Sequence, residues 1–131
     1  MKIAICSSGQ DLESQVNPRF GRCPYFLLVD SETKEFEVLE NTARMAPRGA
    51  GVSAAQMVAN KKVVAVLGVN FGPNAVNVLG EAGIKLYTLP PEKSSVSIDE
   101  ALELHRGGKL EEVKKATGSG RGFQRGGRRG R

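Results

Sequence analysis

Two loops of the chain combine residue types that bind anions. The first, residues 17–26, reads Asn-Pro-Arg-Phe-Gly-Arg-Cys-Pro-Tyr-Phe, and the second, residues 48–51, reads Arg-Gly-Ala-Gly. Guanidinium groups carry several N–H donors in a fixed geometry, and backbone amides that open a helix add further donors and a favourable dipole. The loops therefore predict a site for an anionic ligand. Its candidate residues are Arg19, Phe20, Gly21, Arg22, Cys23, Arg48, Gly49, Ala50 and Gly51.

The two cysteines, Cys23 and Cys6, are the candidate metal ligands. A thiolate is a soft ligand that suits iron, copper or molybdenum–sulfur clusters. The chain has two cysteines and one histidine, so one subunit cannot supply the four N/S ligands of a closed structural site. Such a protein would hold a cluster weakly, hold it across a dimer, or hold a cluster that brings its own ligands. Weak binding is what a carrier needs. The alternative for both cysteines is a small buried hydrophobic residue.

Several features argue against catalysis. The loop at residues 68–74 is placed like an anion site, but it lacks the lysine and the Ser/Thr of a nucleotide-hydrolysing loop. The only histidine, His105, shares a helical face with apolar residues, which is typical of packing. The first predicted strand contains no acid, whereas a metal-dependent nuclease needs converging carboxylates. We therefore expect a protein that is not an enzyme.

The positive charge of the chain is concentrated at its C-terminus. The 131 residues include 19 Lys and Arg and 14 Asp and Glu, a net charge of +5. Residues 118–131 hold five arginines and no acid, so the other 14 basic residues balance the 14 acidic ones. This Arg/Gly-rich tail predicts disorder and is similar to segments that bind nucleic acid. We expect a domain over residues 1–116 and a disordered tail over 117–131.

The apolar runs of the chain are short. Residues 63–67 form one of the longest, far too short to cross a bilayer. The N-terminus lacks the length and cleavage pattern of a signal peptide. We therefore expect a cytoplasmic protein with reduced thiols and no membrane partner, either a monomer or a homodimer.

The hydrophobic pattern predicts an α/β fold with a mixed five-stranded sheet. Alternating or continuous apolar runs predict the strands, and the 3.6-residue period with capping signals predicts the helices. The expected strands are 2–6, 25–30, 35–40, 63–67 and 84–89; the expected helices are 52–60, 73–82 and 98–106, followed by a short amphipathic segment at 110–116. Strand–helix–strand units imply parallel neighbours, and ligands favour the carboxyl ends of such strands. The loops after residue 6, after residue 67 and before residue 52 would meet there.

Four segments, in this order, resemble a known family. They are residues 20–26, 48–56, 72–75 and 82–85. Together they resemble the accessory domain of dinitrogenase iron–molybdenum cofactor biosynthesis, the NifX type that also forms the C-terminus of NifB. The resemblance covers about residues 1–115. It implies a three-layer α/β/α fold of ribonuclease-H-like topology, with sheet order 3-2-1-4-5 and the second strand antiparallel.

The same resemblance implies a small non-enzymatic protein that binds or carries iron–sulfur or molybdenum-containing clusters, such as cofactor precursors, and exchanges them with donor and acceptor proteins. A related small protein of the group binds a molybdenum–copper sulfide cluster without covalent ligation. Family members often carry histidines where this chain has Arg19 and Arg48. The arginines favour holding an anion over ligating a metal. Two alternatives remain open: nucleic-acid binding through residues 118–131, and binding of a phosphorylated small molecule at the same crevice.

Overall fold

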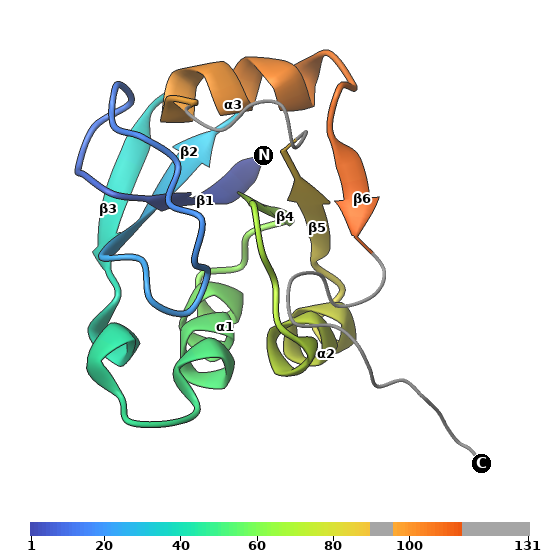
Figure 1. Cartoon of the computed structure of the whole chain (residues 1–131). Coiled ribbons are helices and arrows are strands. Elements are labelled where there is room, and N and C mark those ends of the chain that lie inside the picture. The colour runs from blue at the N-terminus through green and yellow to red at the C-terminus, as the bar shows by residue number, and fades with distance from the viewer. Residues whose placement is uncertain (90–95, 114–131) are drawn as a thin grey trace.

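A computed structural model describes residues 1–89 and 96–113 of the chain (Figure 1). The strands are β1 (Lys2–Ser7), β2 (Tyr25–Asp30), β3 (Phe36–Glu40), β4 (Ala65–Gly68), β5 (Lys85–Thr88) and β6 (Glu111–Val113). The helices are α1 (Ala50–Asn60), α2 (Pro73–Glu81) and α3 (Ile98–Arg106), with a short 3₁₀ helix η1 (Thr42–Met45) before α1. The proposed Arg/Gly-rich tail, residues 117–131, lies outside the described residues. None of the described helices is long and apolar enough to cross a membrane.

The strands form one mixed sheet in the order β3-β2-β1-β4-β5-β6. Strands β1, β4 and β5 run parallel to one another, and β2 is antiparallel to both of its neighbours. The five-stranded prediction was wrong in its number of strands, because β6 pairs with β5 in antiparallel fashion. The segment at 110–116 was predicted only as a short amphipathic segment. Val113 lies opposite Leu86 in the sheet, and its side chain is buried. A long-range pairing therefore decided the local structure.

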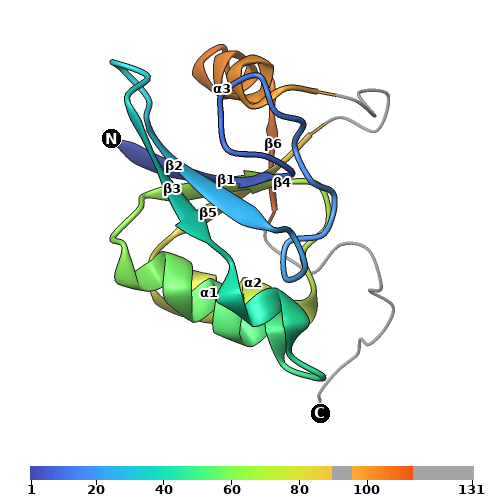
Figure 2. The same ribbon diagram turned by 90° about the vertical axis from the view of Figure 1, so that its left-hand side faces the viewer.

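The sheet is covered by helices on both faces, with α1 and α2 on one side and α3 on the other (Figure 2). Central strand β1 alternates between two cores. Ala4 and Cys6 pack with the residues of α1 and α2, whereas Ile3 and Ile5 pack with those of α3. Because a strand directs successive side chains to opposite faces, burial of both sets is what a central strand of a three-layer fold requires.

The ends of the helices follow the signals in the sequence. Helix α2 begins with Pro73 at its first position, and Gly83 follows it with a φ of +77°. Ser97 caps α3 by accepting a hydrogen bond from the amide of Glu100. Helix α1 begins two residues earlier than expected, at Ala50, which moves the Gly-Ala-Gly segment into its first turn.

The long loop after β1 crosses the carboxyl ends of the central strands. The Asn17 amide donates a hydrogen bond to the Cys6 carbonyl (2.9 Å), and the Val16 amide donates one to the Val96 carbonyl (2.8 Å). The backbone of Arg19 then forms an isolated parallel β-bridge with that of Asn70, in the loop that follows β4. These contacts bring the first arginine-containing loop to the ends of β1 and β4, as the strand–helix–strand pattern predicted.

Candidate functional site

A pocket of about 450 Å³ opens where three loops meet at the carboxyl ends of the parallel strands. It is bounded by the loop at residues 19–22, the first turn of α1, and the segment that leads from β4 into α2. Seven of the nine predicted ligand-binding residues line it, all but Cys23 and Arg48. The lining residues are Arg19, Phe20, Gly21, Arg22, Gly49, Ala50, Gly51, Val52, Asn70, Gly72, Pro73, Asn74 and Ala75.

Two helix N-termini face this pocket. Helices α1 and α2 have glycine N-caps, Gly49 and Gly72, and neither has a hydrogen bond from a side-chain cap. The first helical hydrogen bonds run from the Ser53 amide to the Gly49 carbonyl (3.0 Å) and from the Val76 amide to the Gly72 carbonyl (3.1 Å). The backbone amides between each cap and that donor therefore have no acceptor within the helix. No acidic residue is among the described residues that line the pocket. The helix dipoles and free amides therefore make this pocket favourable for a negatively charged ligand.

Gly21 and Gly51 differ in whether the structure requires a glycine at that position. A Cβ at Gly21 would lie 2.9 Å from the amide nitrogen of Gly51, so only glycine allows the loop to rest on the first turn of α1. A Cβ at Gly51 would meet nothing within 4 Å, and its φ is not positive. Neither packing nor backbone geometry requires glycine at position 51. A glycine there makes the helix less stable than an alanine would. The open space at Gly51 is therefore available to a ligand.

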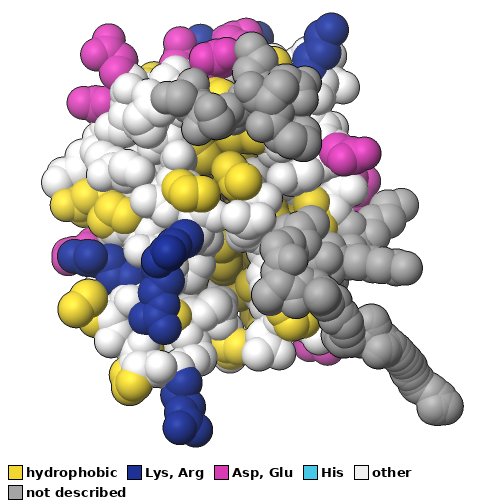
Figure 3. All heavy atoms as spheres, viewed as in Figure 1, with side chains coloured by type: hydrophobic (Ala, Val, Ile, Leu, Met, Phe, Trp, Pro, Cys, Tyr) yellow, Lys and Arg dark blue, Asp and Glu magenta, His cyan; other side chains and the backbone are white. Residues whose placement is uncertain are grey.

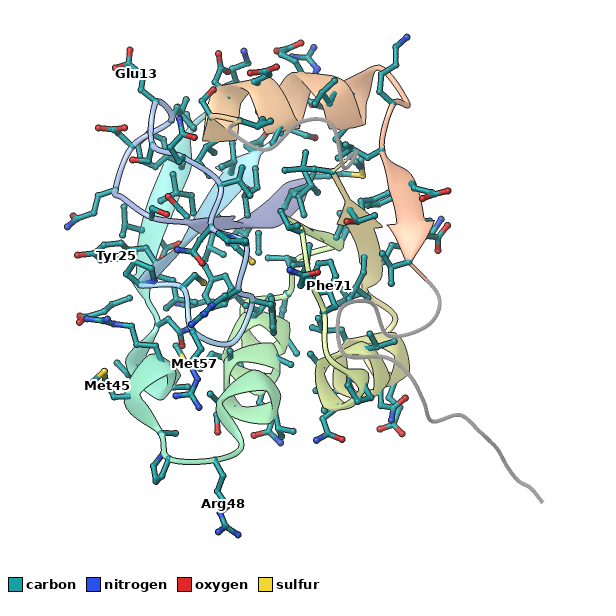
Figure 4. The ribbon with its side chains drawn as sticks, viewed as in Figure 1. Glu13, Tyr25, Met45, Arg48, Met57 and Phe71 are labelled. Carbon is teal, nitrogen blue, oxygen red and sulfur yellow. The ribbon has the colours of Figure 1, made fainter. Side chains whose placement is uncertain are left out.

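The three predicted arginines have three different positions. Arg22 Nη1 donates to the carbonyls of Arg44 and Ala46, both at 2.7 Å, so this arginine braces the segment before α1. Arg19 lines the pocket, and its side chain makes no ion pair within the described part of the chain. Arg48 points away from the body of the molecule (Figure 4) and does not line the pocket. The structure thus brings Arg19 and Arg22, but not Arg48, to the site.

Both cysteines lie in the core beside the pocket. Cys6 and Cys23 are each 0% exposed, and neither lines the pocket. The Cys23 thiol donates to the carbonyl of Phe20 (3.3 Å). Burial, together with the neighbouring Cys23 thiol, raises the pKa of Cys6 well above its usual value. Among the described residues, no group of three or more His, Cys, Asp or Glu side chains could hold a metal ion. In this conformation the thiols are placed as buried residues rather than as accessible ligands.

Phe20 separates the pocket from the core. Its ring packs at 5.3 Å from Phe26 and 5.6 Å from Phe71, measured between ring centroids. Phe71, labelled in Figure 4, is fully buried, and Phe20 is only 3% exposed. These three rings bury a large apolar area and so fix the backbone of both loops that carry the pocket.

Asn41 is a site-supporting residue that the sequence reasoning missed. It is fully buried, and its Nδ2 donates to the carbonyls of Gly21 (3.2 Å) and Cys23 (2.9 Å). Its Oδ1 accepts a hydrogen bond from the Ala43 amide (3.1 Å). Asn41 thereby joins the first loop to the start of η1. Its type and its place before a helical turn were the available signal, since asparagine is a favoured N-cap.

Asn70 and Asn74 were also missed as individual residues. Both line the pocket, and Asn70 Nδ2 donates to the carbonyl of Pro18 (3.4 Å). The segment that contains them, residues 68–74, was recognised as an anion site by its position between a strand and a helix. As the order of the elements predicted, this segment and the Gly-Ala-Gly segment face the same pocket.

Comparison with known proteins finds a matching family and several similar proteins. Residues 1–108 match the family described as dinitrogenase iron-molybdenum cofactor. An uncharacterized protein of Methanocaldococcus jannaschii, MJ0580, is 38% identical over 114 residues, which are 85% of this chain and 90% of that protein.

Two solved structures are also similar. The apo form of the orange protein from Desulfovibrio gigas has a TM-score of 0.82 and 29% identity, covering 89% of this chain and 96% of that one. A putative NifB protein from Thermotoga, TM1290, has a TM-score of 0.76 and 35% identity, covering 91% and 98%. The match over residues 1–108 confirms the resemblance seen in the four sequence segments: the chain belongs to the dinitrogenase iron–molybdenum cofactor family.

Proposed function

We propose that this protein binds and carries a small anionic metal–sulfur cluster, of the iron–sulfur or molybdenum-containing type, in the pocket between the 19–22 loop and the two helix N-termini. The cluster is cargo, and the protein is a carrier rather than a catalyst. The observation that carries the proposal is the pocket itself, in which two helices without side-chain caps face one cavity with no acidic lining residue among those described. Family membership associates the chain with the iron–molybdenum cofactor.

The donor set fits a cluster that brings its own sulfide ligands. Backbone amides and the Arg19 guanidinium are hydrogen-bond donors, and donors of this kind stabilise negative charge on inorganic sulfide or oxide. Because Cys6 and Cys23 are buried, binding in this conformation needs no thiolate ligand. Release then requires no metal–protein bond to break, which suits a protein that passes its cargo on.

Anaerobic reconstitution with iron, sulfide and molybdate, followed by metal analysis and visible absorption, tests the proposal. We expect a stoichiometric loss of bound metal in Gly51→Leu, which fills the cavity, and weaker binding in Arg19→Ala. Arg48→Ala is the matched control, since this arginine points out of the pocket. Equal metal content in Gly51→Leu and the parent would overturn the assignment of the site.

A phosphorylated small molecule is the competing occupant of the same pocket, because amides and guanidinium groups also bind phosphate. Thermal shifts distinguish the two. Stabilisation by inorganic phosphate or a sugar phosphate without metal, and none on reconstitution, would favour the phosphorylated ligand over the cluster.

A further inference from the structure

The acidic residues of the chain avoid the face that carries the pocket. Residues 14–29 and 41–80 contain no aspartate or glutamate, and every residue that lines the pocket lies in these two stretches. In Figure 3, Lys and Arg side chains gather on the lower left of the molecule, whereas most acidic side chains lie along the top and the right edge. Glu40, at the end of β3, marks the boundary of this face.

Four arginines and one methionine form what we call the cationic rim: Arg19, Arg22, Arg44, Met45 and Arg48. All five side chains belong to exposed residues. Within the described residues, none of the four guanidinium groups makes an ion pair. Two of these arginines, Arg19 and Arg22, line the pocket. A cationic cluster without ion pairs produces a positive field that attracts acidic partners and speeds their association.

Met45 is the apolar member of the rim, and hydrogen bonds order the backbone on either side of it. It is 77% exposed, and it lies at the edge of the molecule in Figure 4. The carbonyls of the two residues that flank it accept the hydrogen bonds from Arg22. The 3₁₀ turn adds a bond from the Ala46 amide to the Ala43 carbonyl (3.0 Å). The backbone under Met45 is therefore already ordered, which lowers the entropy cost of binding through it.

We propose that the cationic rim docks a protein that has an acidic surface and an apolar recess for Met45, and that this partner covers the mouth of the pocket. Methionine and arginine are both enriched at protein–protein interfaces, and methionine adapts to different apolar surfaces. The proposal rests on the proposed function in one respect: a partner seated there is placed to deliver or to accept the cluster.

The composition of the rim favours a protein over a nucleic acid. Binding of single-stranded nucleic acid uses exposed aromatic rings for base stacking, together with cations. The phenylalanines nearest the pocket, Phe20, Phe26 and Phe71, are all buried. The apolar group that the rim exposes is a methionine side chain, which gives no flat ring for a base.

Site-specific crosslinking tests this proposal. p-Benzoylphenylalanine replaces Met45 in one variant and Val64 in a control; Val64 is 43% exposed and precedes the start of β4, at the opposite end of that strand from the pocket. Products crosslinked in cells of the source organism are identified by mass spectrometry, and the identified protein is then purified. We expect an acidic protein from position 45 and not from position 64. A product absent at position 45, shared by both positions, or identified as nucleic acid would overturn the proposal.

Calorimetry with the purified partner completes the test. We expect Kd to rise about tenfold or more in Met45→Asp and in Arg44→Glu, and to rise with salt. Lys62→Glu, at an exposed lysine just after α1, should leave Kd unchanged. Unchanged affinity in both rim variants would overturn the proposal.

Metal content separates this proposal from the proposed function. Met45 and Arg44 do not line the pocket, so their variants should load cluster like the parent. Loss of partner affinity with retained metal supports docking at the rim. Failure of every variant and of the parent to load metal would overturn the cluster proposal alone.

Discussion

At the scale of single residues, the site depends on which side chains are absent. Gly21 lies against the backbone of α1, so its lack of a Cβ serves packing, whereas Gly51 faces open space. The same residue type therefore serves the fold at one position and leaves room for a ligand at the other. The substitutions Gly21→Ala and Gly51→Ala distinguish these two roles.

We expect Gly51→Ala to raise the free energy of unfolding by up to about 1 kcal/mol, because alanine is the better helix former and no atom is displaced. Gly21→Ala should lower it by about 1–3 kcal/mol, because its Cβ would overlap the first turn of α1. Urea denaturation measures both changes. A destabilised Gly51→Ala variant would show that the space at this position is already filled.

Asn41 tests the link between the first loop and η1. We expect Asn41→Ala to cost about 2–3 kcal/mol, because a buried carbonyl, a part-buried carbonyl and one buried amide lose their partner. Asn60→Ala, at an exposed asparagine at the end of α1, is the matched control and should change stability by less than about 0.5 kcal/mol. Equal effects in urea denaturation would contradict the anchoring role of Asn41.

Cys6 gives the protein a pH-dependent stability. Its folded-state pKa lies well above 9.0 because burial disfavours the thiolate, so the folded state keeps its proton while the unfolded state loses it. The contribution is therefore complete below the unfolded pKa and decreases as pH rises above it. We expect the free energy of unfolding of the parent to fall more steeply above pH 9.0 than that of Cys6→Ala. Parallel curves for the two proteins would show that Cys6 titrates normally in the folded state.

At the scale of elements, the local signals were reliable where they were strong. Residues 25–30 form a strand with the predicted bounds, and α2 starts at Pro73 as its ring predicts. Strand β6 could not be predicted locally, since its three residues become a strand only by pairing with β5. The burial of Cys23 was equally hidden, because a thiol in a Gly/Pro-rich loop looks the same whether the loop turns toward the core or toward solvent.

Two truncated variants test the contribution of β6. A chain that ends at Val113 keeps every described residue and serves as the reference. A chain that ends at Gly108 loses the buried Val113 and leaves β5 paired on one edge only, with β4, and we expect it to be less stable by about 1.5–3 kcal/mol. Thermal unfolding measures both. Equal stability of the two truncated chains would mean that β6 adds nothing to the core.

At the scale of the whole molecule, the fold accounts for the meeting of the two predicted loops. Parallel strands β1, β4 and β5 place their carboxyl ends along one edge of the sheet, and the segments that follow β1 and β4 meet there with the start of α1. The sequence could predict this meeting from the order of the elements. It could not predict that Arg48 would point outward or that Arg22 would be engaged by two carbonyls, since both depend on the path of the segment before α1.

In the proposed function the pocket, rather than the buried thiols, holds an anionic cluster. Anomalous diffraction at the iron and molybdenum edges, from crystals of the reconstituted protein, tests it most directly. We expect an anomalous peak between Arg19 and the first turns of α1 and α2, and we expect it to remain when Cys6 and Cys23 are both replaced by alanine. A peak bonded to either sulfur, or one that disappears in the double variant while the protein stays folded, would contradict it.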